Sequence, residues 1–269
     1  MSTKSTYKVY AVRYAERQAK RQEHFIGGDP IDEEMWMDYF VWAVVGSERT
    51  WVVDAGFDRR DAEQRDRKLL RSISEGLATI GIDASEVEDL IITHLHYDHI
   101  GGLGQFPKAR LHLQEKEIQY ACSRHMTHEA LSHAFTAGHI AAMVYEVYKG
   151  RVVFYNGETE LAPGLSVHLV GGHTMGLQVV RVWTDLGWLV LASDASHYYE
   201  NMEAGRPFPV VYNVGDMIGA YGTMRRLADS PRYIIPGHDT MVLRRYPAAA
   251  PGLEGIAVRL DVEPKKMPE

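Results

Sequence analysis

The heptapeptide Thr-His-Leu-His-Tyr-Asp-His at residues 93–99 places three imidazoles and a carboxylate within one short segment. It follows the uncharged apolar run Leu-Ile-Ile at residues 90–92, which is typical of a buried strand. It precedes Ile-Gly-Gly at residues 100–102, where glycine indicates close backbone approach or unusual dihedral angles. The four polar side chains are therefore expected at the carboxyl end of a rigid strand.

The spacing within this heptapeptide suits two metal ions. His94 and His96 are two residues apart, so on an extended chain both imidazoles point to the same side. Asp98 and His99 are adjacent and point apart, so they can serve a second ion. Imidazole and carboxylate suit zinc, and also iron, manganese or cobalt. A chance His-rich loop is the alternative, but four buried polar groups this close together have few partners besides a metal.

The composition is that of an ordinary globular protein, with 45% hydrophobic and 24% charged residues among 269. We expect one domain over residues 1–269. The net charge of −7 disfavours nucleic acid as a partner. A single cysteine, Cys122, excludes an internal disulfide and a thiolate zinc cluster. The chain begins without a signal-peptide pattern and its apolar runs are too short for a membrane span, so we expect a cytoplasmic protein with no membrane partner. The oligomeric state stays open, with a homodimer as one option.

The arrangement of an apolar strand followed by a residue able to bind metal recurs four more times. These residues are Asp54, His173, Asp194 and His238. None is a strong signal alone, but with the heptapeptide they favour a dinuclear site. Asp54 has two interpretations, a turn-forming residue or a group that hydrogen-bonds to a ligating histidine and orients it.

The candidate ligands divide into two groups and a bridge. The expected assignment is His94, His96 and His173 for one ion, Asp98, His99 and His238 for the other, and Asp194 between them.

With these residues in this order, the chain resembles the metallo-β-lactamase superfamily and, within it, the N-acyl-homoserine lactonases. The resemblance rests on His-x-His-x-Asp-His, on Asp-x-Gly upstream, and on Gly-His, Ser-Asp-Ala and Gly-His-Asp downstream, over roughly residues 38–240. The segment Arg-Arg-Tyr-Pro at residues 244–247 is similar to the lactonases in particular. The resemblance implies an α/β (α+β) fold, the four-layer αβ/βα sandwich, with the ligands at one edge where the two sheets meet.

The resemblance also implies a metal-dependent hydrolase that acts on ester bonds. Two divalent ions, zinc first, would supply a bridging hydroxide that opens an N-acyl-homoserine lactone or a related lactone, as in quorum quenching. Asp98 would orient the hydroxide or carry its proton. The partner would be a small-molecule substrate. Two alternatives stay open: a thioester hydrolase of the glyoxalase II type, whose usual C-terminal helical domain has little room after His238, and a hydrolase of another small cyclic ester.

The chain departs from the lactonase pattern at two positions. Lactonases carry a tyrosine three residues after the bridging aspartate, where this chain has His197 followed by Tyr198. Either residue could supply the hydrogen bond to the lactone carbonyl, and simple packing is the equal alternative. Many relatives also read Gly-His-x-x-Gly-His around the third histidine, a pattern that ends here in Gly176-Leu177.

Three further segments carry structural expectations. Apolar residues at helical spacing predict a helix over residues 61–80, with its charged face in solvent. A second helix is predicted over residues 127–148, with Thr127 as its N-cap, as a helical cap insertion that forms a lid or a pocket wall. Residues 263–269 are expected to form a disordered tail.

Overall fold

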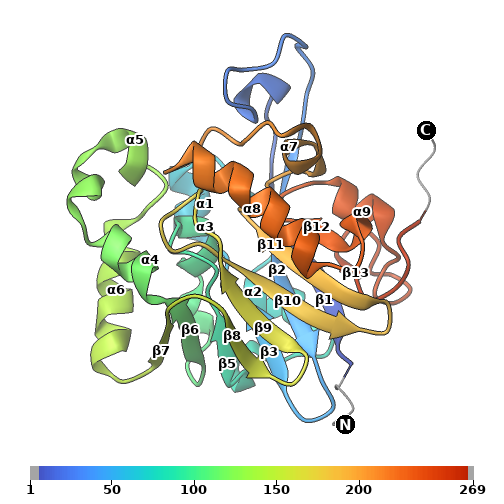
Figure 1. Ribbon diagram of the computed structural model, residues 1–269. Helices are drawn as coiled ribbons and strands as arrows, with labels where there is room; N and C mark the ends of the chain where they lie inside the picture. The colour runs from blue at the N-terminus through green and yellow to red at the C-terminus, as the bar shows by residue number, and fades with distance from the viewer. Residues whose placement is uncertain (1–5, 266–269) are drawn as a thin grey trace.

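Two β-sheets face each other in the computed structural model, which describes residues 6–265, and helices cover their outer faces (Figure 1). The first sheet runs in the order β13-β1-β2-β3-β5-β6-β7, with β4 paired to β1. Its strands are β1 (Lys8–Arg17), β2 (Met37–Val45), β3 (Thr50–Val53), β4 (Lys68–Leu69), β5 (Asp89–Ile91), β6 (Arg110–Gln114), β7 (Val152–Tyr155) and β13 (Ala257–Arg259). The predicted mixed α/β sandwich is confirmed.

The second sheet runs in the order β12-β11-β10-β9-β8. Its strands are β8 (Thr159–Ala162), β9 (Leu165–Leu169), β10 (Gln178–Thr184), β11 (Gly187–Ser193) and β12 (Ile234–Pro236). The α-helices are α1 (Arg59–Gln64), α2 (Ile73–Ala78), α3 (Tyr97–Ile100), α4 (Glu115–Ala121), α5 (Glu129–Ser132), α6 (Ala137–Tyr148), α7 (Tyr199–Ala204), α8 (Val214–Leu227) and α9 (Met241–Arg245). No helix within residues 6–265 is long and apolar enough to cross a membrane.

Strand β2 shows why the central strands are mostly apolar. Its even-numbered residues, such as Phe40 and Trp42, pack in the core between the two sheets. Its odd-numbered residues, such as Tyr39 and Val41, pack in the outer core beneath the helices. Because successive side chains of a strand point to opposite faces, a strand covered on both sides is apolar at nearly every position, and Asp38 in β2 is paired with Arg13.

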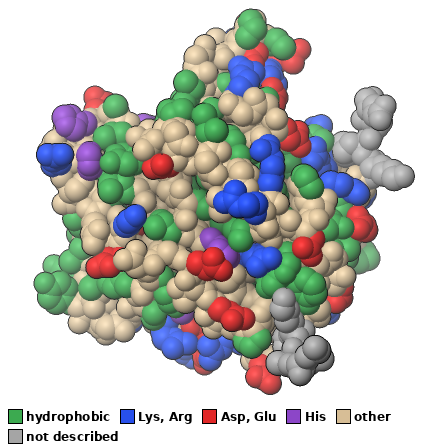
Figure 2. Space-filling view, in the orientation of Figure 1, with side chains coloured by type: hydrophobic (Ala, Val, Ile, Leu, Met, Phe, Trp, Pro, Cys, Tyr) green, Lys and Arg blue, Asp and Glu red, His purple; other side chains and the backbone are tan. Residues whose placement is uncertain are grey.

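The connection between β1 and β2 projects from the sandwich, at the top of Figure 1 and as the protrusion in Figure 2. It contains one short 3₁₀ helix, η1 (Arg21–Glu23). Arg17 and Met37, at its base, and Glu23, in η1, line the cavity described below. The connection between β1 and β2 therefore contributes to this cavity as well as to the outer surface.

The helix predicted over residues 61–80 is wrong as one element. Helix α1 ends at Gln64, β4 pairs with β1, and α2 begins only at Ile73 with Ser72 as its N-cap. Asp66 adopts a left-handed conformation with φ of 53°, which a continuous helix does not allow. Pairing with β1 thus outweighs the local helical pattern.

The helix predicted over residues 127–148 is also interrupted. Thr127 ends the 3₁₀ helix η4 (Arg124–Thr127), and its hydroxyl donates to the Arg124 carbonyl instead of capping a helix. Between α5 and α6 the buried Phe135 turns inward and packs on His96, with ring centroids 4.5 Å apart. Burial of this aromatic ring explains the break.

The expected disordered tail lies partly outside the described residues, at 266–269. Within the described part, the Lys265 amide donates to the Arg245 carbonyl at 2.7 Å. Glu263 accepts a hydrogen bond from Tyr233.

Candidate metal centre

The candidate ligands come together where several strands end. Strands β3 and β5 run parallel, as do β11 and β12, so their carboxyl ends meet at one end of the sandwich. Six candidate ligands are buried and the seventh, Asp98, is partly exposed. The cluster consists of His94, His96, Asp98, His99, His173, Asp194 and His238.

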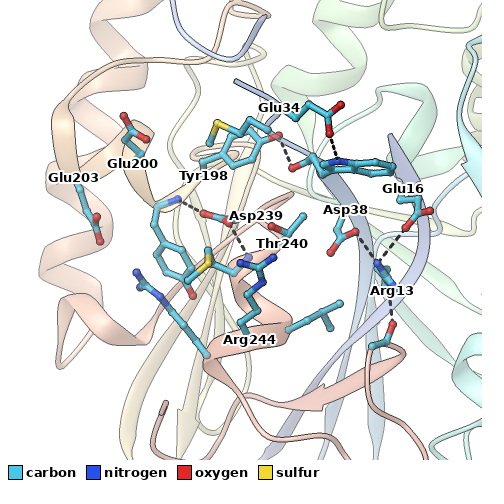
Figure 3. Close-up of a pocket in the computed structure, with 17 residues that line it drawn as sticks. Arg13, Glu16, Glu34, Asp38, Tyr198, Glu200, Glu203, Asp239, Thr240 and Arg244 are labelled. Atoms are coloured by element: carbon cyan, nitrogen blue, oxygen red, sulfur yellow. Dashed lines mark hydrogen bonds and ion pairs between the residues drawn. The ribbon is translucent and has the colours of Figure 1, made fainter. Parts of the chain in front are cut away.

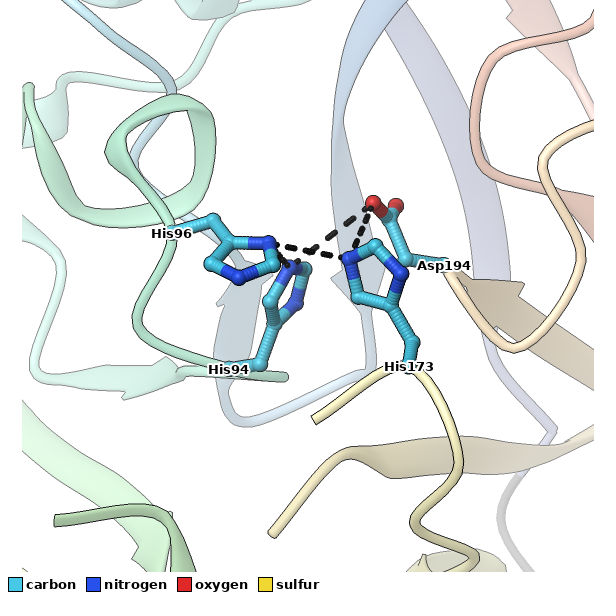
Figure 4. Close-up of side chains that lie close together, drawn as sticks. All are labelled: His94, His96, His173 and Asp194. Atoms are coloured by element: carbon cyan, nitrogen blue, oxygen red, sulfur yellow. Dashed lines mark hydrogen bonds and ion pairs between the residues drawn. The ribbon is translucent and has the colours of Figure 1, made fainter. Parts of the chain in front are cut away.

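The first group is His94, His96 and His173, with one oxygen of Asp194 (Figure 4). His96 Nδ1 lies 3.1 Å from His94 Nε2 and 2.9 Å from His173 Nε2. His173 Nε2 lies 3.1 Å from Asp194 Oδ2. Ligand atoms around a tetrahedral zinc ion stand about 3.3 Å apart, given metal–nitrogen bonds near 2.0–2.1 Å. This spacing fits a single ion.

The second group is Asp98, His99 and His238. Asp98 Oδ2 lies 3.8 Å from His99 Nε2 and 3.9 Å from His238 Nε2. The other oxygen of Asp194, Oδ1, lies 3.0 Å from His238 Nε2 and 3.4 Å from His99 Nε2. The two oxygens of Asp194 therefore face different groups.

Three histidines are held through Nδ1, so that Nε2 points into the cluster. His99 Nδ1 lies 2.7 Å from Asp54 Oδ2, His173 Nδ1 lies 2.6 Å from the Val210 carbonyl, and His238 Nδ1 lies 2.9 Å from the Asp38 carbonyl. Such partners fix the tautomer and leave Nε2 free for a metal. His99 Nε2 is buried and has no hydrogen-bond partner, which a metal ion would supply.

The electrostatics of the cluster suit a divalent cation. Burial, and then the neighbouring imidazoles, lower the pKa of His94 and His96 well below the usual value. Burial opposes ionisation of Asp194, but the surrounding histidines, led by His197 and His238, hold its pKa well below the usual range. At His99 and His238 burial opposes protonation, but nearby carboxylates, led by Asp194, raise the pKa above the usual value. Buried imidazoles around an ionised carboxylate are a donor set that zinc and similar metals bind. The residues present therefore fit a metal.

The position of Asp54 agrees with the second of its two interpretations, a group that hydrogen-bonds to a candidate ligand and orients it. Besides contacting His99, its carboxylate accepts hydrogen bonds from the backbone amide and hydroxyl of Thr93. Asp54 itself has a left-handed backbone with φ of 63°, uncommon for a residue other than glycine. Its carboxylate thus joins the end of β3 to the ligand loop after β5.

Glu117, in the first turn of α4, was not singled out from the sequence. It is fully buried, and its two oxygens accept from the amides of Leu95 and Gly176, each at 2.9 Å. A Cβ at Gly176 would lie 2.2 Å from the Glu117 amide nitrogen, so only glycine fits this approach. Glu117 therefore ties the two loops that carry His94, His96 and His173. A glutamate near a helix start is ordinary, and no signal marked it.

A cavity of about 290 Å³ opens onto the cluster. His197 lines it, stacked on Phe208 at 3.6 Å between centroids, with Nε2 3.1 Å from Asp194 Oδ2. Tyr198 is not placed to contact a substrate here. Its hydroxyl lies 3.1 Å from His24 Nε2 and donates to the Trp36 carbonyl, beside a separate cavity of about 820 Å³ (Figure 3). Of the two candidates, His197 faces the cluster.

Three arginines also line this cavity: Arg17, Arg65 and Arg67. The last two belong to the charged segment that the sequence assigned to a solvated helix face. That assignment is wrong for both residues.

Comparison with known proteins agrees with this architecture. The family described as the metallo-beta-lactamase superfamily matches residues 36–238, and the chain belongs to that superfamily. An N-acyl homoserine lactonase of Bacillus thuringiensis subsp. kurstaki is 29% identical over 135 residues, which cover 49% of this chain and 48% of the relative. The chain thus spans about half the length of the curated relatives it matches.

Solved structures show the same fold. A quorum-quenching N-acyl homoserine lactone lactonase superposes with a TM-score of 0.73 at 20% identity, over 89% of this chain and 95% of the other. A dizinc quorum-quenching lactonase superposes with a TM-score of 0.66 at 17% identity, over 88% and 91%. The resemblance predicted from the motifs is confirmed at the level of family and fold.

Proposed function

We propose that the protein is a metal-dependent hydrolase that opens a lactone ring at a centre of two divalent ions, with zinc as the first candidate. The observation that carries this proposal is Asp194, whose Oδ1 faces the second group and whose Oδ2 faces the first. A carboxylate shared in this way can bridge two ions in one hydrolytic site. The similarity to N-acyl homoserine lactonases supports a lactone or a related small cyclic ester as substrate.

Two ions bound in such a centre would lower the pKa of a shared water toward about 7 and polarise an ester carbonyl. We assign proton handling to Asp98. Its side chain is 11% exposed and lines the cavity, whereas the other candidate ligands are nearly fully buried. It can therefore orient a water molecule, accept its proton and return that proton to the leaving alkoxide.

We assign substrate positioning to His197. Its ring is held against Phe208, and its Nε2 lies at the floor of the cavity beside Asp194. Since Nε2 is within hydrogen-bond distance of Asp194, its N–H would be shared between that carboxylate and the carbonyl oxygen of a bound ester, on which negative charge develops. The cavity is at the small end of the range for ligand pockets, which favours a compact substrate.

The test is proton release by metal-analysed protein on a panel of lactones that includes acyl-homoserine lactones, with a glutathione thioester as the contrast substrate. We expect lactone turnover that is lost on chelation and restored by added zinc. His94→Ala should abolish turnover and lower the metal content. A matched control is His128→Ala, an exposed residue between η4 and α5 that lies outside the cavity lining.

Two outcomes would contradict the proposal. No turnover of any lactone by protein that carries about two metals per chain would exclude the lactonase assignment. Turnover of the thioester alone would replace it with a thioester hydrolase at the same centre.

A further inference from the structure

Arg67 brings an unpaired cation to the wall of the metal-site cavity. Its Nε donates to the Tyr97 hydroxyl at 3.1 Å, and its Nη1 donates to the carbonyls of Arg65 and Asp66. Among residues 6–265, no carboxylate lies within ion-pair distance of this guanidinium, and its Nη2 donates to no protein group. Arg67 is half-buried. A guanidinium held in this way has one donor edge left for a ligand.

The neighbouring arginines differ from Arg67 in their partners. Arg65 uses its terminal nitrogens on the carbonyls of His133 and Phe135 and on the Thr136 hydroxyl, and it stacks on the Tyr97 ring at 4.0 Å. It anchors the cavity wall and keeps its positive charge, because none of these partners is ionised. Arg17 instead forms an ion pair with Glu23. Asp98, across the cavity, is close enough to Arg67 to help raise its pKa, but it forms no ion pair with it. Two of the three cavity arginines therefore bring a positive charge that no ion pair within residues 6–265 neutralises.

Contacts through Tyr97 and Tyr39 connect the Arg67 guanidinium to the metal centre. The Tyr97 hydroxyl donates to the Tyr39 hydroxyl at 3.5 Å, and the Tyr39 ring packs edge-on against His238 at 5.0 Å between centroids. Arg67 thus lies two aromatic side chains from a candidate ligand of the second group. Arg67 lines the same cavity as Asp98 and His238, so a substrate whose carbonyl sits at the centre shares this cavity with Arg67.

The charge balance of the cavity favours an anion. Two divalent ions would outweigh the carboxylates of Asp98 and Asp194, and Arg65 and Arg67 add two positive charges. A neutral substrate would gain no electrostatic attraction from these positive charges. It would also place an apolar group against the free N–H groups of Arg67, which would then lose their water without gaining a partner. A carboxylate would be attracted to the cavity and would accept a charge-assisted hydrogen bond.

We propose that this cavity selects a compact lactone or ester that itself carries a carboxylate, with Arg67 as the partner of that group. The proposal rests on the function proposed above and narrows its substrate class. A single free terminal nitrogen on Arg67 suits one carboxylate oxygen, whereas a phosphate usually draws several donors at once. Arg67 acts in binding, and the ring-opening chemistry stays with the metal centre.

The first arm of the test compares 5-oxotetrahydrofuran-2-carboxylate with the corresponding carboxamide, which has the same ring without the charge. Wild type should hydrolyse the carboxylate with a kcat/KM about tenfold or more above that of the carboxamide. Arg67→Gln should remove this preference through a higher KM, and Arg67→Lys should retain part of it. Arg60→Gln, on the exposed face of α1, removes the same charge outside the cavity lining and should keep the preference.

The second arm measures binding without turnover. It uses calorimetry on metal-loaded protein with 3-oxocyclopentane-1-carboxylate, a carbocyclic analogue that cannot be hydrolysed, and with its carboxamide. Tighter binding of the carboxylate that depends on Arg67 supports the proposal even if no lactone is turned over, in which case only the lactonase assignment fails. Turnover of both lactones without preference overturns the proposal and leaves the lactonase assignment intact. Equal binding of both analogues also overturns the proposal, and turnover alone then decides the lactonase assignment. If Arg67→Gln does not fold, the proposal is decided by the carboxylate preference of wild type and by its partial loss in Arg67→Lys.

Discussion

The Nδ1 atom of His99 lies 2.7 Å from a carboxylate oxygen of Asp54, and both side chains are buried. The carboxylate sits at the end of β3 and the imidazole belongs to the second ligand group. Because the imidazole donates its Nδ1–H to the carboxylate, its Nε2 is held toward Asp194 and Asp98. One hydrogen bond from outside the candidate ligand set thus holds the orientation of a candidate ligand.

Replacing Asp54 with asparagine should weaken the second metal position selectively. The amide keeps the shape but loses the negative charge that strengthens the His99 imidazole as a ligand. We expect metal affinity at that position to fall about 10- to 100-fold, with the first ion retained. Competition with a chelator and metal analysis per chain measure this. Asp185→Asn, in the exposed turn between β10 and β11, is the control. Equal retention of both ions would contradict the orienting role.

Replacing Glu117 with glutamine should destabilise the fold. The native carboxylate accepts from two backbone amides, whereas a glutamine turns a donor toward one of them and leaves that amide without an acceptor. A buried donor left unpaired costs about 1–3 kcal/mol. Denaturant unfolding of metal-loaded protein measures the loss. Glu115→Gln, exposed in the same turn of α4, should change the unfolding free energy little. An unchanged midpoint in Glu117→Gln would show that the two loops do not depend on this carboxylate.

Replacing His197 with phenylalanine separates positioning from metal binding. A phenyl ring keeps the stacking on Phe208 but removes the Nε2 atom beside Asp194. If this nitrogen donates to the substrate carbonyl, kcat should fall about 100-fold with the metal content unchanged. His197, Asp194 and His238 also lie close enough to share an ion. A lower metal content in the variant would therefore assign His197 as a ligand and reject the carbonyl role.

The metal cluster was accessible to sequence reasoning because its information is local. The candidate ligands lie in the short segments that follow apolar runs, and parallel strands bring such segments to one end of a sheet. Four of the candidate ligands also lie within six residues, at 94, 96, 98 and 99, where the spacing indicates to which side of the chain each side chain points. The prediction needed no knowledge of long-range packing.

Arg67 was missed for the opposite reason. Its segment has a helical pattern, but residues 68–69 pair with β1, more than fifty residues earlier in the chain. That pairing and the left-handed Asp66 turn the chain and bring Arg67 to the cavity. Local propensity carries no information about such a partner. The sequence also could not show which of the neighbours His197 and Tyr198 faces the metal-site cavity. His197 lines that cavity and Tyr198 does not.

His24 should make the free energy of unfolding depend on pH. Its ring is fully buried beside Tyr198 and Phe208, and burial, opposed mainly by its hydrogen bond to the Met35 carbonyl, lowers its pKa to about 4. The unfolded chain binds this proton near pH 6.5, so the unfolded state takes up more protons between pH 6.5 and 4. The stabilisation from neutral His24 is therefore complete above pH 6.5 and is lost as the pH falls through 4.

The corresponding variant is His24→Gln, whose amide can still donate to the Met35 carbonyl. Between pH 7 and 4, wild type should lose about 3 kcal/mol more unfolding free energy than the variant. Denaturant titrations at both pH values, at equal metal content, give this difference, and the protonation of the metal-site histidines cancels between the two proteins. The same loss in both proteins would mean that His24 is not held neutral by burial.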